Sequence, residues 1–481
     1  MKKATKVVIL IATMLAISYP DVTAQTRSVQ GIPIPPLHPF TPQQPRRIEL
    51  LNGMVVLLAE NHELPLIEGI ALVRGGSHDE PAIKTGLVDI YGEVWRTGGT
   101  STKTGDQLDD FLEARAAKVE TKSLSDATSI TLSCLKDDFD KVFEIFIDVL
   151  QNPEFRPDKL EIARKRKYDT ISRYNDRIEQ IAEREAAKLA FGADNPYARS
   201  PENATVAAVT RMDLVAWHNM YVHPNNIILG ISGDFDAGAM ESKLRKVFES
   251  WPKGPSLPED QVQYHSASPG YYFISKGDVN QSRILIVGLG IQRNNPDYCA
   301  VKVFNEAFGG GFSSRLFNDI RTKRGLAYGV SGAVGSNFGH LGILQIMLAT
   351  GSHTTVEALR AVTEDIDNVT RHPITDDEVK QAKDSILNSL IFQLDSPNKI
   401  LSERMTYEFY RYPADWLTNY ESHIRKVTTA DVNRVATKYL HRDQLAVLVV
   451  GDSKNFDEPL STLGSVKEIR NTSPSQPGAH N

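Results

Sequence analysis

The chain has 481 residues, of which 41% are hydrophobic, and its formal net charge at pH 7 is −6. This length suits two to four domains, each large enough to bury a core of its own. Charges of both signs are dispersed along the sequence, which argues against nucleic acid or an anionic membrane surface as the partner.

The first 24 residues have the pattern of a secretory signal peptide. Three lysines precede an apolar run at 7–18, and small residues at 22–24 offer a cleavage point. Because Gln25 rather than Cys follows, the lipoprotein pattern is missing, and no later stretch is long and apolar enough to cross a bilayer. We therefore expect an exported, periplasmic protein without a transmembrane segment. An uncleaved membrane anchor is the alternative.

Strand and helix patterns follow a proline-rich arm, 25–47, which we expect to run extended over the surface. Residues 50–58 predict two strands joined at Asn52-Gly53, and 67–73 predict another strand. Apolar residues spaced three to four apart then predict helices at 104–117, 139–150 and 157–175.

A second proline-rich stretch, 252–270, has the composition of a linker between two halves. After it the order of elements begins again, with a strand at 282–288, a helix at 297–308, strands to about 349 and helices at 355–369 and 375–392. We expect residues 463–481 to form a polar tail.

One structural unit occurs twice in the chain. Residues 209–234 match residues 427–452 without a gap, at a constant offset of 452 − 234 = 218. In each copy a Thr-x-x-Asp signal opens a short helix that ends at a tyrosine, and an apolar run then ends at Gly-Asp. The repeat predicts an α+β protein with two homologous lobes, 48–251 and 271–462, each a mostly antiparallel sheet flanked by helices. Two such lobes can close on each other and leave a cavity between them.

The two cysteines fall in different halves. Cys134 and Cys299 could be bridged in an oxidising compartment, but the sequence does not predict a bridge, and two unpaired thiols are the default expectation.

Several short motifs connect this chain with one peptidase family. The first half contains Gly75-Gly76-Ser77 before Glu80, Gly86-Leu87 at the start of a helix, and Gly99-Thr100 after it. The second half contains the more specific run from Gly309 to Phe317, followed by Arg321 and by the segment from Arg324 to Tyr328. With these motifs the chain resembles the pitrilysin/insulinase family of zinc metallopeptidases over nearly its whole mature length. The resemblance implies a duplicated α+β domain whose two copies form a clamshell.

The zinc motif of that family is missing. Family peptidases carry H-x-x-E-H after the Gly-Leu that opens this helix, where two histidines bind zinc and the glutamate acts as general base. Here Asp89 and Glu93 stand at the two histidine positions, and Gly92 stands at the position of the base. For the distal carboxylate ligand the frame offers Asp169 or Thr170.

Two interpretations of this altered motif remain open. Asp89, Glu93 and Asp169 could form an atypical metal site, although three carboxylates suit calcium or magnesium better than zinc. The plainer interpretation is a solvated or cavity-lining acidic face in which Arg96, one turn away, pairs with Glu93. On the opposite face the sequence predicts an apolar stripe that belongs to the core, formed by Leu87, Tyr91, Val94 and Trp95.

The second half keeps its functional residues. The resemblance implies that Arg321 and Tyr328 project toward a zinc site and that Ser313, Ser314 and Arg315 help to bind substrate. A guanidinium and a phenol can hold a peptide carbonyl and stabilise the oxyanion that forms when water attacks it. The alternative is structural: Arg321 would pair with Asp319 or Asp106, and Tyr328 would pack in a sheet.

A chain that lacks the zinc half and keeps the Arg/Tyr half resembles the noncatalytic subunit of a heteromeric family member. The leading hypothesis is therefore an exported, substrate-binding subunit, inactive alone, that binds no metal and supplies Arg321 and Tyr328 to the zinc site of an H-x-x-E-H partner. That complex would cleave peptides. The alternative hypothesis is a peptide-binding or scaffold protein with no catalytic role.

Overall fold

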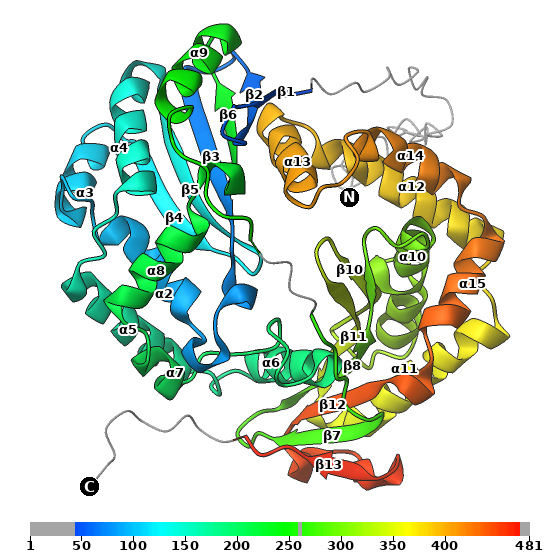
Figure 1. The fold of residues 1–481 in the computed structure, drawn as a ribbon. Coiled ribbons are helices and arrows are strands. Elements are labelled where there is room, and N and C mark those ends of the chain that lie inside the picture. The colour runs from blue at the N-terminus through cyan, green and yellow to red at the C-terminus, as the bar shows by residue number, and fades with distance from the viewer. Residues whose placement is uncertain (1–43, 258–261, 472–481) are drawn as a thin grey trace, which may run out of the picture. The chain divides into compact units, whose positions relative to one another are not determined.

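The computed structural model describes residues 44–257 and 262–471. The expected signal peptide, 1–24, and nearly all of the expected proline-rich arm, 25–47, lie outside the described residues. The described chain contains two sheets, each with helices of its own (Figure 1).

The first lobe contains a six-stranded sheet in the order β1-β2-β6-β3-β5-β4, in which only β2 and β6 pair in parallel. Its strands are β1 (Arg46–Glu49), β2 (Val55–Glu60), β3 (Leu66–Arg74), β4 (Lys118–Ser123), β5 (Ala127–Leu135) and β6 (Ile227–Gly233). Its helices are α2 (Leu87–Thr97), α3 (Gly105–Glu113), α4 (Phe139–Gln151), α5 (Pro157–Ser172), α6 (Ile178–Phe191), α7 (Asn203–Ala207), α8 (Arg211–Tyr221) and α9 (Ala237–Phe248). The hairpin predicted around Asn52-Gly53 and the three predicted helices are confirmed, but the first strand of the hairpin, β1, lies at Arg46–Glu49, before the predicted range of 50–58.

The second lobe contains a seven-stranded sheet in the order β13-β7-β12-β8-β11-β10-β9, whose longest pairings are antiparallel. Its strands are β7 (Gly270–Ser275), β8 (Gln281–Leu289), β9 (Ile291–Gln292), β10 (Gly329–Asn337), β11 (Leu341–Gly351), β12 (Ala446–Gly451) and β13 (Val466–Glu468). Its helices are α10 (Tyr298–Asn305), α11 (Thr355–Arg371), α12 (Asp376–Gln393), α13 (Pro397–Phe409), α14 (Trp416–Lys426) and α15 (Thr429–Tyr439), with the π-helical segments η6 (Glu306–Gly310) and η7 (Phe317–Lys323).

The repeated unit folds alike in both lobes. Thr210 caps α8 by accepting the backbone N–H of Asp213 at 3.3 Å, and Thr428 caps α15 by accepting that of Asp431 at 3.2 Å. Each helix ends at a tyrosine, and the strand that follows, β6 or β12, lies inside its sheet. The repeat predicted from the sequence is therefore a structural repeat, and the α+β fold with two lobes is confirmed.

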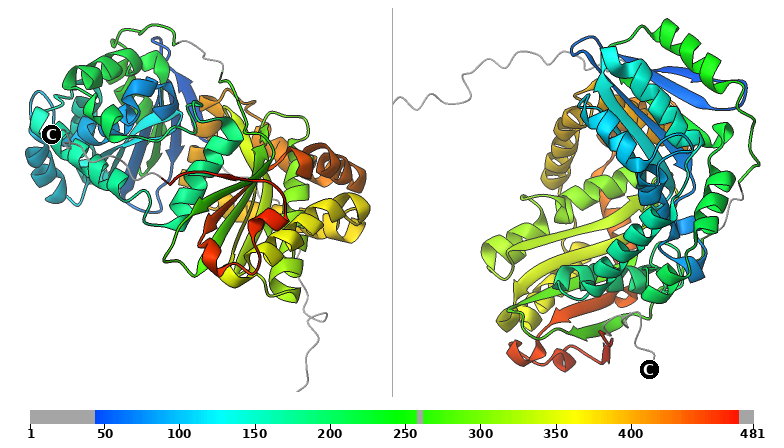
Figure 2. Two further views of the ribbon diagram at one scale, coloured as in Figure 1. Left: turned by 90° about the horizontal axis from the view of Figure 1, so that it is seen from below. Right: turned by 90° about the vertical axis from the view of Figure 1, so that its left-hand side faces the viewer.

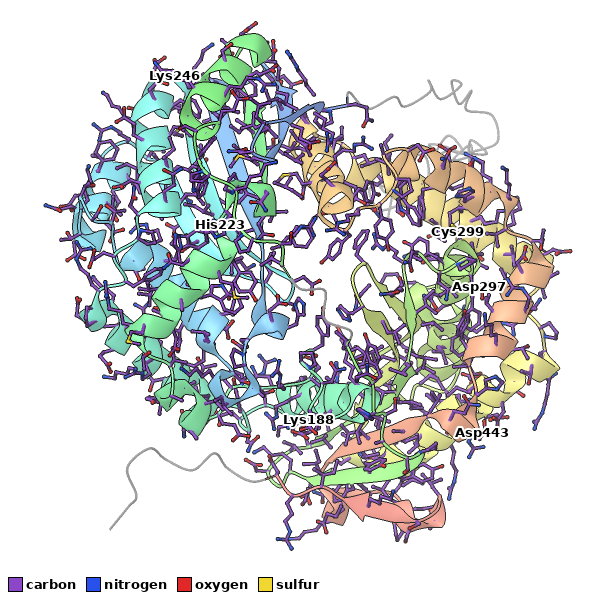
Figure 3. All side chains as sticks on the ribbon, viewed as in Figure 1. Lys188, His223, Lys246, Asp297, Cys299 and Asp443 are labelled. Atoms are coloured by element: carbon purple, nitrogen blue, oxygen red, sulfur yellow. The ribbon has the colours of Figure 1, made fainter. Side chains whose placement is uncertain are left out.

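Each lobe buries one face of its sheet under its own helices. On α4 the apolar residues recur every three or four positions, and Phe139, Val142, Phe146 and Val149 are all buried in the first core. On α11 the same spacing buries Leu359, Val362 and Ile366 in the second core. Asp297 lies at the start of α10 (Figure 3). It accepts hydrogen bonds from Lys438 Nζ and Tyr439 Oη of α15, both at 2.8 Å.

The other face of each sheet is covered by a helix from the other half of the sequence. Helix α6 packs through Ile181 and Ala182 against Ile274, Leu285 and Leu448 of the second sheet. Figures 1 and 2 show α6 against these strands. Helix α13, which stands one repeat later, packs through Leu401 and Met405 against the first sheet. The two halves therefore share apolar cores.

The expected linker, 252–270, and the expected polar tail, 463–481, flank the second lobe. The described part of 252–269 contains no helix or strand, and Ala267 N–H donates to the carbonyl of Leu189 on α6 at 2.8 Å. The expected polar tail, 463–481, instead begins with an edge strand, because β13 pairs with β7. Cys134 and Cys299 are both free thiols.

Candidate functional site

Helix α2 carries the altered zinc motif, and a buried carboxylate fixes its first turn. Glu80 accepts the backbone N–H groups of Gly86 and Val88 at 2.8 and 2.9 Å. Burial raises the pKa of Glu80 to about 7. The residues at 89, 92 and 93 are therefore presented by a well-fixed helix.

The two carboxylates at the histidine positions are neutralised by basic residues of α5. Lys167 Nζ lies 2.5 Å from Asp89 Oδ2, and Ser123 Oγ donates to Asp89 Oδ1 at 3.0 Å. Arg166 lies 2.6 Å from Glu93 Oε1. Both carboxylates thus have cationic partners within the first lobe.

The expected pairing of Arg96 with Glu93 is wrong. Arg96 is buried; its Nε donates to the carbonyl of Val119 at 3.0 Å, and its Nη1 lies 2.6 Å from Asp109. Burial of the guanidinium requires partners on α3 and β4 instead of an exposed neighbour on the same helix face.

At the position of the general base there is no room for a side chain. A Cβ on Gly92 would lie 2.7 Å from the backbone nitrogen of Ser123, because α2 packs directly on β4. The Thr121 hydroxyl donates to the carbonyl of Gly92 at 2.6 Å and holds the two elements together. The loss of the base is thus built into the packing.

The candidate distal ligands lie on α5 and face solvent. Asp169 and Thr170 are exposed, and the Thr170 hydroxyl donates to the carbonyl of Arg166 at 2.9 Å. Among the described residues, no group of three or more His, Cys, Asp or Glu side chains could hold a metal ion. The residues of this face therefore do not fit the zinc that the family motif implies, nor do they form the atypical carboxylate site.

The opposite face of α2 belongs to the core, as predicted. Leu87, Tyr91, Val94 and Trp95 are all buried, and Tyr91 Oη lies 3.0 Å from Nδ1 of His218. Burial lowers the pKa of His218 to about 4, so this histidine is neutral and structural.

The second-lobe motif forms two π-helical segments around an irregular turn. Gly309 lies in η6, where a Cβ would stand 2.5 Å from the backbone nitrogen of Gly332 on β10. Arg321 lies in η7. Segments of π-helix are rare and frequently mark functional sites. The sequence predicted a helix at 297–308 without its π-helical end, because apolar spacing does not distinguish an α-helix from a π-helix.

Of the three residues expected to bind substrate, only Ser313 is exposed. Ser314 is buried, and its Oγ accepts the N–H of Phe317 at 3.4 Å. Arg315 forms a two-pronged ion pair with Glu378, at 2.6 and 2.7 Å, and donates to the carbonyl of Pro373 at 2.7 Å. These contacts fasten the turn to the start of α12.

Arg321 is held by two aromatic rings. Its guanidinium carbon lies 4.8 Å from the ring centre of Phe317 and 5.0 Å from that of Tyr328. No ion pair or hydrogen bond joins its side chain to any residue that the structure describes. Tyr328 is 84% exposed and precedes β10, so it does not pack in the sheet.

The structural alternative for Arg321 and Tyr328 is therefore wrong. Asp319 pairs with Arg324 at 2.6 Å, and Asp106 pairs with Lys159 at 2.8 Å. Arg321 is paired with neither carboxylate.

An exposed phenylalanine extends this group. Phe312 is 80% exposed, and its ring stands edge-on to that of Phe317 with the centres 5.0 Å apart. We refer to Phe312, Phe317, Arg321 and Tyr328 as the aromatic platform. No role for either phenylalanine was predicted from the sequence. A large apolar side chain directly after three glycines was the signal that could have identified Phe312.

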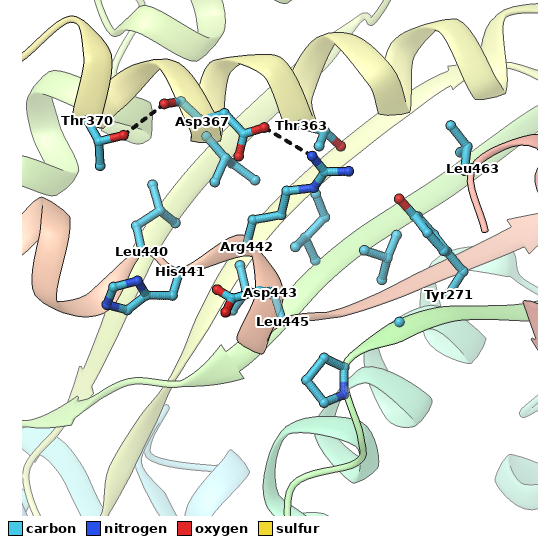
Figure 4. Close-up of a pocket in the computed structure, with 15 residues that line it drawn as sticks. Tyr271, Thr363, Asp367, Thr370, Leu440, His441, Arg442, Asp443, Leu445 and Leu463 are labelled. Carbon is cyan, nitrogen blue, oxygen red and sulfur yellow. Dashed lines mark hydrogen bonds and ion pairs between the residues drawn. The ribbon is translucent and has the colours of Figure 1, made fainter. Parts of the chain in front are cut away.

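The structure also contains cavities away from these residues. A pocket of about 610 Å³ lies between α11 and the second sheet, where Arg442 pairs with Asp367 at 3.0 Å (Figure 4). None of the predicted site residues lines it.

A second cavity, of about 890 Å³, is lined in part by Ile171 and Tyr174 near the end of α5. Burial raises the pKa of Tyr174, and the charge of Asp89 raises it further.

Comparison with known proteins identifies two matching family descriptions. Residues 56–201 match "Insulinase (Peptidase family M16)", and residues 208–386 match "Peptidase M16 inactive domain".

No helix in the described part of the chain is long and apolar enough to cross a membrane.

Individual relatives cover most of the chain at low identity. The uncharacterized zinc protease YmxG of Bacillus subtilis is 22% identical over 85% of this chain and 99% of its own length. The non-peptidase homolog YmxG of Helicobacter pylori is 22% identical over 83% of this chain and 92% of its own length.

Two solved structures share the fold. A peptidase M16 inactive domain from Pseudomonas fluorescens is 23% identical, with a TM-score of 0.78 over 87% of this chain and all of that one. The periplasmic protease PqqL of Escherichia coli is 15% identical, with a TM-score of 0.72 over 86% of this chain and 46% of that one.

Proposed function

We propose that this chain, which belongs to the insulinase (M16) peptidase family as a noncatalytic member, is the substrate-binding subunit of a heteromeric zinc peptidase. In this proposal a second chain with an intact H-x-x-E-H motif supplies the zinc site, and this chain supplies Arg321 and Tyr328. The complex cleaves peptides, and this chain alone does not.

One contrast carries the proposal. In the first lobe, Asp89 and Glu93 are bound to Lys167 and Arg166, and Gly92 has no room for a base. In the second lobe the Arg321 guanidinium has no ionic partner among the described residues, and Tyr328 is exposed. The charged groups of the first lobe, which would bind metal in the family peptidases, are paired with one another. The second lobe, which would contact a substrate carbonyl, keeps its donors free.

The proposed chemistry of this chain is electrostatic. The partner's zinc, when bound, would activate water and polarise the peptide carbonyl. Arg321 would donate N–H groups to the carbonyl oxygen, and Tyr328 would donate its O–H to the same oxygen as negative charge develops there. The guanidinium of Arg321 lies against the rings of both Phe317 and Tyr328, which orient it before substrate arrives. Little reorganisation of this side chain is therefore needed. Ser313, which is exposed, is the serine available for direct contact with the peptide.

We place the complex outside the cytoplasm, in the periplasm. The signal-peptide pattern at 1–24 supports this placement. The similarity in fold to a periplasmic protease is compatible with it.

The test is reconstitution with the H-x-x-E-H chain that co-purifies with this protein. Arg321→Ala and Tyr328→Phe should leave the two chains paired and lower kcat by roughly 100- to 1,000-fold, since the contacts that they lose are strongest in the transition state. Arg425→Ala is the control, because Arg425 forms an exposed pair within α14 and should not affect the rate. An unchanged rate in both Arg321 and Tyr328 variants would refute the proposal.

A second candidate function is a peptide-binding or scaffold protein with no catalytic role. The description of the Helicobacter pylori relative as a non-peptidase homolog favours it. Full peptidase activity of the complex after both substitutions, with peptide binding weakened, would support this function.

A further inference from the structure

Phe312 stands out among the residues of the second-lobe motif. Oxyanion stabilisation needs Arg321 and Tyr328, but it does not need an apolar ring that is 80% exposed to solvent. Single exposed apolar residues are ordinary on protein surfaces. This one is continuous with Phe317, Arg321 and Tyr328, because ring contacts at 5.0, 4.8 and 5.0 Å connect the four side chains. The result is one amphipathic surface.

The backbone that presents Phe312 is fixed on both sides. On its C-terminal side, Arg315 is bound to Glu378, and Asn318 Nδ2 donates to the carbonyl of Ser313 at 2.9 Å. On its N-terminal side, Glu306 accepts the Ser385 hydroxyl at 2.7 Å, and its carboxylate lies against Gly310 and Gly311. A binding surface that is already ordered pays little entropy when a ligand arrives.

The surface has two chemically distinct parts. Arg321 offers free N–H donors to a carbonyl or carboxylate oxygen, whereas the neighbouring Arg315 and Arg324 are already ion-paired. Phe312 offers an apolar ring one aromatic residue away from that guanidinium. An extended peptide advances about 3.3 Å per residue, so a carbonyl held by Arg321 places a side chain one to three residues away over Phe312.

We propose that the aromatic platform selects peptides with an aromatic or large aliphatic side chain within three residues of the carbonyl that Arg321 holds. Phe312 is the specificity-determining residue, and Arg321 binds all peptides alike. This inference rests on the proposed function, because that function places the substrate on this side of the second lobe.

Two fluorescein-labelled decapeptides of equal charge, identical except for a central Phe or Ala, test the inference with the full mature chain alone. By fluorescence anisotropy, the Phe peptide should bind about fivefold more tightly, the size of effect that one aromatic contact gives. In Phe312→Ala the two affinities should become equal. In Arg321→Gln both affinities should fall while their ratio stays the same.

Phe392→Ala is the matched control, since Phe392 is 70% exposed on α12 and lies outside the platform. Far-UV circular dichroism checks that each variant is folded. The inference would be overturned if Phe312→Ala kept the preference for the Phe peptide, or if Phe392→Ala lost it equally. Failure of the Phe peptide to bind at millimolar concentration would also overturn it. Loss of pairing with the zinc-bearing chain, with peptide preference intact, would make Phe312 a partner contact and would also overturn it. Because no catalysis is measured, failure here is distinct from failure of the reconstitution test.

Discussion

At position 92 the backbone of β4 occupies the space that a side chain would need. Against the H-x-x-E-H motif, Gly92 stands at the position of the glutamate. The structure adds that the loss cannot be reversed by one substitution, because the helix and the strand have closed together. The absence of a side chain at this position is therefore a property of packing as well as of residue identity.

Gly92→Ala should destabilise the protein by about 1–3 kcal/mol, even though alanine favours helices, because the added methyl group forces α2 and β4 apart. Urea unfolding of both proteins measures this difference. Gly277→Ala is the control, since a Cβ there meets nothing within 4 Å. A stabilised Gly92→Ala variant would contradict the packing argument.

Glu80 predicts a pH dependence of stability. Its folded-state pKa, about 7, lies above the ordinary value of 4.5, so its favourable contribution is complete below pH 4.5 and is lost as pH rises toward 7. Glu80→Gln cannot ionise. The free energy of unfolding of the variant minus that of the wild type should therefore increase by about 3 kcal/mol across this range. Urea titrations at several pH values measure it, and a pH-independent difference would refute the assignment.

At the scale of elements, the sequence predicted helices such as α4 and α5, but it predicted neither α6 nor α13, nor the sheet that each of them covers. Helices α6 and α13 occupy equivalent places in the repeat, and each packs on the sheet of the other half. Periodicity within a helix defines an apolar face without identifying the surface that buries it. Only the contacts show this exchange.

The exchange predicts that the halves lose stability together. Ile181→Ala on α6 and Met405→Ala on α13 should each cost about 2–5 kcal/mol, because both side chains are fully or almost fully buried. Each variant should still unfold in one calorimetric transition, at a lower temperature. Ile162→Ala, at a position 46% exposed on α5, should change the transition little. Two separated transitions would show that the halves are independent.

At the scale of the whole molecule, the first lobe is expected to hold no metal in solution. The purified mature chain should contain no stoichiometric zinc and should cleave no peptide, because Lys167 and Arg166 already neutralise Asp89 and Glu93. Elemental analysis after dialysis against a metal-free buffer measures the zinc content. One tightly held zinc per chain that disappears in Asp89→Ala would contradict this expectation.

The sequence by itself determined the two-lobed α+β organisation, the repeat and the missing zinc motif. These features depend on local signals, such as the Thr-x-x-Asp caps, the apolar spacing and the residues at 89, 92 and 93. The tertiary structure alone decided the partners of charged side chains. Arg96 pairs with Asp109 instead of Glu93, and Arg321 is flanked by rings instead of Asp319. A charged side chain pairs with whatever the fold brings near it, and contacts between distant segments leave no periodic trace in the sequence.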